Sequence, residues 1–222
     1  MRDVAKSLPM EKDTIFRLYS QTKPVTGAAV MMLFEEGHFL LSDPIAKYLP
    51  EFKDMVVYVG TKDGKMQTEP ARPITIHHLL THTSGMTYSL FPTPVGQLYR
   101  DAFIDGSSAP IIQTDPQTGK LSVLSDEDDP ERHGTLKEWS ETAAKLPLVA
   151  QPGTEWHYSV SIDVLGRLIE VISGQTYRDF MKSRLFDPLG MSDTDFYVPA
   201  GKISRFATSY VPNPKGGLVA ID

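Results

Sequence analysis

The sequence has no cysteine, and this absence removes several kinds of chemistry at once. Disulfide bonds, thiolate metal sites and a cysteine nucleophile are all excluded, and the redox compartment is left undetermined. Long hydrophobic runs are missing as well, because the longest nearly apolar stretch, Val25 to Phe34, is about half of the ~20 residues that a membrane-spanning helix needs. Met1 is followed by Arg2, Asp3 and Lys6 instead of an apolar segment, so no secretory signal is visible and a cytoplasmic location is the default expectation.

An excess of positive charge is also missing. Lys and Arg number 22 against 28 Asp and Glu, which gives a formal net charge of −6. The basic residues are scattered along the chain rather than gathered in a stripe, which argues against nucleic acid as a partner. With 222 residues, 41% of them hydrophobic, the chain has the length and composition of a globular protein with a substantial core.

Hydrophobic periodicity predicts a largely helical chain. Residues 14–19 alternate as a short strand or extended segment does, and the spacing then becomes that of a helix carrying Val25, Ala29 and Met32 and ending at Gly37. Five further helices are predicted, over Asp43-Pro44 to Pro50, from Thr75 to Ser84-Gly85, over residues 136–146, over residues 161–172, and from Thr176 to near Leu185. We therefore expect at least six helices and very few strands.

Residues 105–134 differ in composition from the rest of the chain. They contain the turn-forming clusters Gly-Ser-Ser-Ala-Pro, Asp-Pro-Gln-Thr-Gly and Asp-Glu-Asp-Asp-Pro, with little apolar periodicity. We interpret them as an inserted loop or lid within a single domain spanning residues 1–222, and both a functional lid and an ornamental insertion remain open. The acidic run Asp126 to Asp129 is interpreted as a solvated loop.

Ser20 and Lys23 form a Ser-x-x-Lys motif at the entrance of the first predicted helix. Residues three apart on a helix share a face, with Cβ atoms roughly 5–6 Å apart, so Lys23 can reach Ser20 Oγ. A serine hydroxyl becomes a nucleophile when a neighbouring base takes its proton, and the positive helix N-terminus favours an alkoxide at Ser20 and a neutral amine at Lys23. The motif also arises by chance, so a capping serine with a solvated lysine is the alternative interpretation.

The histidines and two other serines offer competing sites. His78 and His82 have the spacing of two metal ligands on a helix, with His77 beside them, but the glutamate of His-Glu-x-x-His is missing. A structural role is favoured over zinc, and no cofactor is expected. Ser84 and Ser159 lie in no Gly-x-Ser-x-Gly elbow, so neither is preferred as the nucleophile.

Ordered blocks along nearly the whole chain carry a resemblance to a known family. The blocks are Asp13-Thr14-Ile15-Phe16-Arg17, Thr22-Lys23-Pro24-Val25-Thr26, Glu36-Gly37, Leu41-Ser42-Asp43-Pro44, Leu79-Leu80-Thr81-His82-Thr83-Ser84-Gly85-Met86, Gln151-Pro152-Gly153-Thr154 and Pro188-Leu189-Gly190-Met191. In these blocks the chain resembles serine β-lactamases, penicillin-binding proteins and related esterases, most of all the class C β-lactamase-related esterases (family VIII carboxylesterase-like). The resemblance implies an α+β fold of the β-lactamase/transpeptidase type, with this chain covering mainly the helical part and little of the antiparallel sheet.

The family's second catalytic element is a Tyr-x-Asn motif, which Tyr158-Ser159-Val160 matches in part. The resemblance implies that Tyr158 and Lys23 share the acid and base roles in forming and hydrolysing a serine acyl-enzyme. Val160 stands where asparagine would contact the amide of a β-lactam, and this departure favours an esterase. The alternative for Tyr158 is a packed aromatic side chain beside Trp156.

The family's third motif, Lys-Thr-Gly or His-Thr-Gly on a strand, has no match after Tyr158, and its N-terminal hairpin has no match either. The resemblance implies an oxyanion hole made of the Ser20 N–H and a donor on that strand. Because losing one such donor costs about 10²–10³ in rate, the chain by itself is expected to be a feeble catalyst. Apolar surface left without its sheet predicts an oligomer, pairing with another polypeptide, or a longer parent protein.

Hydrolysis of carboxylic esters is thus the leading predicted function, with Ser20, Lys23 and Tyr158 as the catalytic residues. β-Lactamase or D-alanyl-D-alanine peptidase activity is one alternative, and a non-catalytic scaffold or binding relative is another. The predicted partner is a small ester or β-lactam-like substrate, without nucleic acid and without a membrane span.

Overall fold

The computed structural model describes residues 1–102, 104, 111–114, 121–124, 134–213 and 216–221. Within these residues the helices are α1 (Thr22–Glu35), α2 (Ile76–Leu80), α3 (Pro94–Asp101), α4 (Leu136–Ala143), α5 (Ser161–Ser173) and α6 (Tyr177–Met181). The strands form three antiparallel pairs, β1 (Val56–Lys62) with β2 (Lys65–Pro70), β3 (Ile111–Thr114) with β4 (Leu121–Leu124), and β5 (Tyr210–Pro212) with β6 (Leu218–Ala220). The described part is mainly helical with small antiparallel pairs, as predicted.

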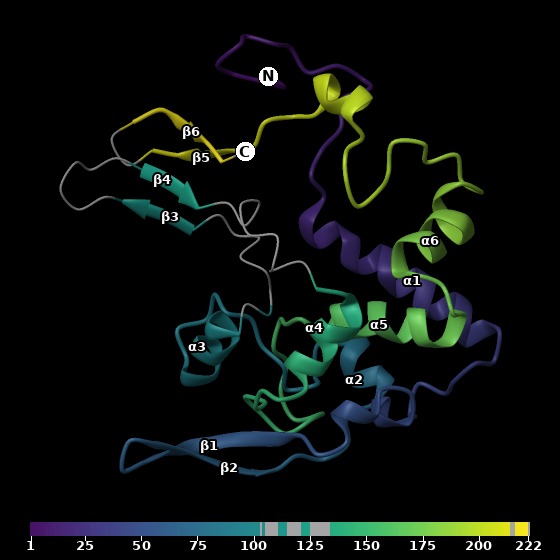
Figure 1. Ribbon diagram of the computed structural model, residues 1–222, viewed down its shortest axis with the longest axis vertical. Coiled ribbons are helices and arrows are strands. Elements are labelled where there is room, and N and C mark those ends of the chain that lie inside the picture. The colour runs from purple at the N-terminus through teal and green to yellow at the C-terminus, as the bar shows by residue number, and fades with distance from the viewer. Residues whose placement is uncertain (103, 105–110, 115–120, 125–133, 214–215, 222) are drawn as a thin grey trace.

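Helix α5 is the centre of the helical body. It packs against α1, α2, α4 and α6, and Figure 1 shows these helices gathered around it. Val164, Leu165, Leu168 and Ile169 are fully buried and recur at the spacing of one helix face. Gly174 ends the helix in the left-handed conformation, at φ 70°, which a residue with a Cβ rarely adopts. The predicted helix over residues 161–172 is therefore confirmed.

Helix α1 lies along α5, but its buried face is turned relative to the predicted one. Thr26, Val30 and Leu33 are buried, whereas Val25 and Met32 are only half-buried. A threonine occupies this buried position because its hydroxyl donates to a main-chain carbonyl one turn earlier, at 2.9 Å. Ala29, which was predicted on the buried face, is fully buried, so the predicted and observed faces overlap but are not the same.

The predicted helix from Asp43 to Pro50 is wrong. The structure has two 3₁₀ turns there, Ile45–Lys47 and Pro50–Phe52. Leu49, before the proline, takes a non-helical conformation (φ −123°, ψ 82°), because the proline ring disfavours a helical residue ahead of it. Helix α2 begins after Thr75 as predicted but ends at Leu80, before Ser84-Gly85.

The hairpin of β1 and β2 was not predicted. It turns at Asp63 and Gly64, which have φ values of 51° and 74°. Asp-Gly between two β-prone runs is a strong hairpin signal, since this tight turn needs positive φ at both positions. The sequence therefore carried a signal for this hairpin in a chain that we took to be nearly free of strands.

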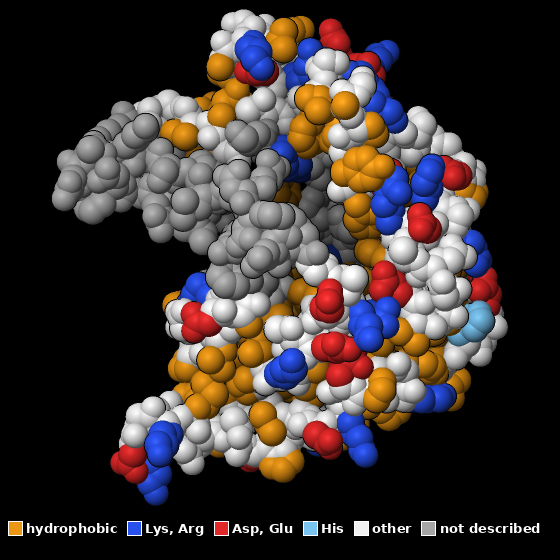
Figure 2. Space-filling model, viewed as in Figure 1, with side chains coloured by type: hydrophobic (Ala, Val, Ile, Leu, Met, Phe, Trp, Pro, Cys, Tyr) orange, Lys and Arg blue, Asp and Glu red, His pale blue; other side chains and the backbone are white. Residues whose placement is uncertain are grey.

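The segments before α1 and after α6 form the upper part of the molecule in Figure 1, which also contains both termini. Residues 14–19 form no strand: Ile15 makes a single bridge to Phe206, and Tyr19 already lies in a 3₁₀ turn. A cavity of about 870 Å³ lies between residues 14–19 and 192–199. Figure 2 shows hydrophobic side chains gathered beside the hollow at this level.

Two further sequence predictions concern the insertion at residues 105–134 and membrane-spanning helices. Of the predicted insertion at residues 105–134, only β3, β4 and Gly134 lie within the described residues, and the acidic run Asp126 to Asp129 lies outside them. Among the described helices, none combines the length and apolar character needed to cross a bilayer.

Candidate active site

Ser20 lies in a 3₁₀ turn, Tyr19–Gln21, that runs directly into α1. Its side chain is exposed, and Lys23 Nζ, from the first turn of α1, donates to Ser20 Oγ at 3.3 Å. Tyr19 has a φ of 45°, an uncommon conformation for an aromatic residue, immediately before this serine. Strained backbone of this kind persists only where the surrounding structure fixes it and is frequent at functional sites.

Tyr158 reaches the same serine from a segment 138 residues further along the chain. Its hydroxyl donates to Ser20 Oγ at 2.5 Å, and Lys23 Nζ lies 4.8 Å from the centre of its ring. The segment that carries Tyr158 leads directly into α5, which packs against α1. The structure thus brings together the three residues singled out in the sequence.

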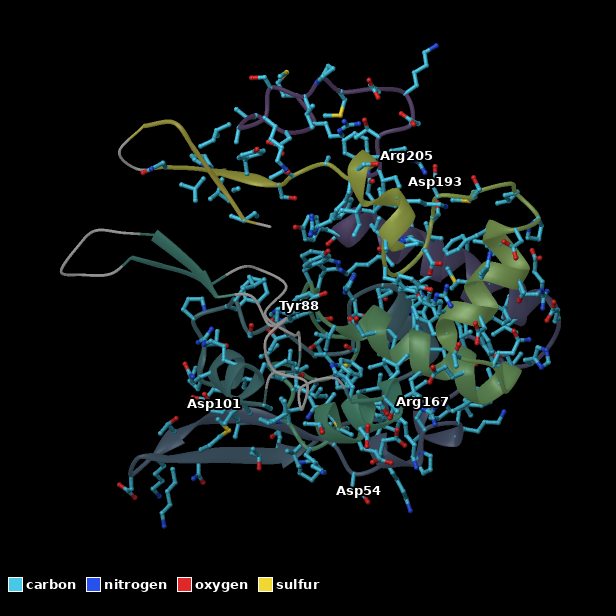
Figure 3. All side chains as sticks on the ribbon, turned by 45° about the horizontal axis from the view of Figure 1, so that its top comes forward. Asp54, Tyr88, Asp101, Arg167, Asp193 and Arg205 are labelled. Carbon is cyan, nitrogen blue, oxygen red and sulfur yellow. The ribbon has the colours of Figure 1, made fainter. Side chains whose placement is uncertain are left out.

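Two aromatic side chains beside this group were not predicted as part of it. The ring centre of Tyr88 lies 5.5 Å from that of Tyr158 and 5.5 Å from Lys23 Nζ. Figure 3 shows Tyr88 near the middle of the molecule. Trp156 stacks beside Tyr158 with ring centres 6.3 Å apart and is 64% exposed. No spacing rule connects Tyr88 with Lys23, because their contact is made only by the tertiary fold.

The environment shifts the two tyrosines on either side of Lys23 in opposite directions. Burial raises the pKa of Tyr88 to about 12, and the hydrogen bond and charge of Lys23 only partly oppose this. Burial also raises the pKa of Tyr158, but hydrogen bonds with Ser20 and Lys23 and the charge of Lys23 outweigh it, so the pKa is lowered overall. Groups whose environments separate their pKa values take different acid and base roles. Tyr158 is therefore the more acidic phenol and the better base candidate.

Lys23 shifts in the direction opposite to the neutral amine favoured from the sequence. Burial lowers the pKa of Lys23, but hydrogen bonds and charge interactions with Tyr158 and Tyr88 outweigh it, so the pKa is raised. The prediction from the sequence considered only the helix N-terminus, which lowers a lysine pKa. It did not include the two phenols from distant segments, Tyr158 and Tyr88, which raise the pKa of Lys23. The contacts with Tyr158 and Tyr88 therefore favour the ammonium form of Lys23.

The three clustered histidines occupy different positions. His78 Nδ1 accepts from the Thr75 N–H at 3.2 Å while Thr75 Oγ1 accepts from the His78 N–H, which forms a capping box at the start of α2. His77 is exposed, and His82 packs against the ring of Tyr158. Among the described residues no group of three or more His, Asp or Glu is placed to hold a metal ion.

Val160 is 1% exposed and belongs to the hydrophobic core, at the residue before α5. The position that the resemblance assigns to a polar asparagine is therefore apolar here. A buried valine offers no hydrogen bond to a substrate amide.

The whole chain, residues 1–222, matches the family model described as Beta-lactamase. Protein Rv1367c of Mycobacterium tuberculosis is 36% identical over 212 residues, which are 94% of this chain and 46% of that protein. Esterase EstB of Burkholderia gladioli is 34% identical over 203 residues, 91% of this chain and 43% of the esterase. The chain therefore spans less than half the length of these curated relatives.

The fold is also similar to that of solved structures. The structure of EstCE1, described as a hydrolase with promiscuous acyltransferase activity, superposes with a TM-score of 0.73 at 28% sequence identity. The match covers 100% of this chain and 49% of EstCE1.

Proposed function

Because the chain belongs to the Beta-lactamase family, we propose that it is the nucleophile-bearing part of a serine hydrolase that cleaves carboxylic esters through an acyl-enzyme. The observation that carries this proposal is the position of Ser20 Oγ, with Tyr158 OH at 2.5 Å and Lys23 Nζ at 3.3 Å. An exposed serine between a phenol of lowered pKa and an ammonium group has both a proton acceptor and a stabilising charge.

Acylation begins with Tyr158 in its phenolate form, held by the Lys23 ammonium. The phenolate takes the Ser20 proton while Oγ attacks the ester carbonyl carbon, and the new C–O bond leaves a negative charge on the carbonyl oxygen. When this tetrahedral intermediate collapses, the bond to the alcohol breaks and the alcohol oxygen takes the proton from Tyr158. The products are the free alcohol and an ester between the acyl group and Ser20.

Deacylation repeats these proton transfers with water. Tyr158 takes a proton from the water molecule as its oxygen attacks the acyl carbon, and it returns that proton to Ser20 Oγ as the acid leaves. Because the same phenol is base and then acid in each half-reaction, its pKa must lie near the working pH. The lowered pKa of Tyr158 is in the required direction.

Esters fit this site better than β-lactams. Val160 is buried and gives the substrate no amide partner, whereas an ester substrate needs none. The similarity to EstB, an esterase by name, points the same way. β-Lactamase or D-alanyl-D-alanine peptidase activity remains the alternative that an experiment must separate.

We also propose that a second copy of the chain, or a further segment of polypeptide, covers the apolar surface beside the cavity. Phe16, Leu18, Phe196, Tyr197 and Ile203 are all exposed there. An apolar patch of this kind is typical of surfaces that associate. A monodisperse monomer in light scattering that binds no hydrophobic dye would contradict this.

The first experiment is labelling with a fluorophosphonate probe, read by intact mass, together with turnover of a short-chain aryl ester and of a chromogenic cephalosporin. We expect one adduct, lost in Ser20→Ala and retained in Ser204→Ala, which alters an exposed serine far along the chain. Ester turnover without cephalosporin turnover supports the esterase, and the reverse supports the alternative. A folded wild-type chain that is not labelled would identify a non-catalytic scaffold and contradict the proposal.

A further inference from the structure

His82 holds the segment around Tyr158 on both sides. Its carbonyl oxygen accepts from the His157 N–H at 2.8 Å, before the tyrosine. Its Nδ1 accepts from the Ser159 N–H at 3.3 Å, after the tyrosine, and lies 3.2 Å from Ser159 Oγ. The imidazole ring also packs on the Tyr158 ring, with centres 4.9 Å apart. One residue therefore contacts the main chain on either side of Tyr158 and the ring itself.

A chain of buried hydroxyl groups fixes the far side of this contact. Ser159 Oγ lies 2.7 Å from Ser161 Oγ, which lies 2.7 Å from Ser84 Oγ, and Ser84 Oγ accepts from the Met86 N–H at 3.1 Å. All three serines are fully buried. Because buried polar groups that are all paired resist rearrangement, the network fixes Ser159 at one end of the Tyr158 segment.

The backbone of His82 is itself fixed. Its φ is 55°, a left-handed conformation, and its N–H donates to the Leu79 carbonyl at 3.3 Å just beyond α2. A ring nitrogen that accepts from an N–H carries no proton, so the His82 proton is on Nε2 and the ring is neutral. Burial, and then the charge of Lys23, lower the pKa of His82, which agrees with a neutral ring.

Resting on the function proposed above, we infer that His82 is a positioning residue that holds the Tyr158 phenol in line with Ser20 Oγ. It does so through its contacts with the main chain on either side of Tyr158 and with the Tyr158 ring. Tyr88, Trp156 and Lys23 also lie against the half-buried Tyr158 ring. Their contacts are with the tyrosine side chain, whereas His82 in addition bonds to the main chain before and after the tyrosine. Misplacing a catalytic group by about 1 Å can cost roughly 10² in rate, which makes this restraint kinetically visible.

The test compares His82→Gly, His82→Asn and the control His77→Asn. Glycine tolerates the positive φ and removes the ring, whereas asparagine also tolerates it and returns an acceptor near the Nδ1 position. His77 is an exposed histidine on α2 and serves as the matched control. Circular dichroism checks that each variant is folded.

We expect His82→Gly to lower kcat for the aryl ester about 10²-fold with little change in KM, and His82→Asn to recover at least about one tenfold step of that loss. The control is expected to match the wild type. A folded glycine variant with wild-type kcat, or an asparagine variant no better than glycine, would overturn the inference.

A second readout keeps the inference separate from the proposed function. The difference in tyrosinate absorbance between each protein and its Tyr158→Phe partner gives the pKa of Tyr158 without any turnover. We expect this pKa to be higher in His82→Gly than in the wild type, because a displaced phenol loses its hydrogen bonds with Ser20 and Lys23. If the wild type is inactive, the proposed function fails, and an unchanged Tyr158 pKa in the glycine variant would overturn the His82 inference by itself.

Discussion

The helical body and the upper part of the molecule are held together by different interactions. Around α5 the side chains are apolar and fully buried, and this packing places the first turn of α1 against the segment that leads into α5. In the upper part, residues 192–206 carry ion pairs such as Arg205 with Asp193, at 2.7 Å, which lie next to each other in Figure 3. Surface ion pairs contribute little to stability, whereas apolar burial contributes a great deal.

This difference separates the proposed catalytic residues from the neighbouring cavity, which none of the three lines. Ser20, Lys23 and Tyr158 are positioned by the body, so the proposed proton transfer would depend on packing within the chain. The cavity beside them is bounded by residues 14–19 and 192–199, where apolar side chains are exposed. The proposed catalytic residues and the cavity therefore have different structural supports, and we expect them to respond differently to mutation.

Tyr158→Phe is expected to have the largest effect. Removing the hydroxyl group takes away the proposed base while leaving the ring packing, so kcat for the aryl ester should fall by about 10²–10⁴ with the fold intact. Steady-state kinetics and circular dichroism measure the two properties. Tyr58→Phe, which removes a hydroxyl paired with Thr61 in β1, is the control and should retain activity. Equal losses in both variants would contradict a specific role for Tyr158.

Lys23→Met should move the pH profile. In the wild type, the hydrogen bond and charge of Lys23 help to lower the pKa of Tyr158 below its ordinary value of 10.0. The phenolate that we propose as the base therefore forms at a lower pH than in a free tyrosine. Without the ammonium this pKa rises, and the ascending limb of kcat/KM moves to higher pH, with a lower plateau. The pH dependence of kcat/KM measures the shift, with Lys53→Met, an exposed lysine, as the control. An unmoved limb would exclude Tyr158 as the titrating base.

The helical body was the more predictable of the two regions. The helix over residues 161–172 was read correctly because its apolar period and its terminal glycine agree, and the family resemblance is confirmed by a match over the whole chain. The two 3₁₀ turns after Asp43 and the β1–β2 hairpin were missed, because in short segments a proline or a two-residue turn outweighs the apolar pattern.

The site was predictable in its residues but not in its electrostatics. Ser20, Lys23 and Tyr158 stand in recognisable motifs, and the structure brings them within contact distance, although their catalytic roles stay a prediction. The rise in the Lys23 pKa depends first on Tyr158 and then on Tyr88, and no local motif connects Tyr88 to Lys23. Contacts between distant segments decide such shifts, and a single sequence does not encode them in any readable spacing.

Gly85→Ala tests how tightly the body is packed. Gly85 has a φ of 82°, and a Cβ there would lie 2.1 Å from the carbonyl oxygen of Ala150. The left-handed conformation alone costs about 1–3 kcal/mol with a side chain, so the free energy of unfolding should fall by more than about 2 kcal/mol once the backbone clash is added. Gly27→Ala, in α1 with nothing within 4 Å, should instead stabilise by about 0.5–1 kcal/mol. Urea denaturation measures the change in the free energy of unfolding for both variants. Equal changes would contradict the close approach of the Ala150 carbonyl oxygen to Gly85.

Arg205→Gln tests the upper part and should have the smallest effect. The hydrogen bond with Arg205, then that with Lys202, lowers the pKa of the Asp193 carboxyl well below its ordinary value of 3.8. A depressed carboxyl pKa stabilises the folded state above the unfolded value, and this contribution is lost as the pH falls below 3.8. The variant should therefore unfold at a slightly lower urea concentration than the wild type at neutral pH, and the two unfolding midpoints should converge in acid. The difference between the midpoints should also shrink at high salt, since salt screens exposed charges. A loss as large as that of Gly85→Ala would contradict the contrast drawn between the two regions and would make ion pairing a main support of the upper part.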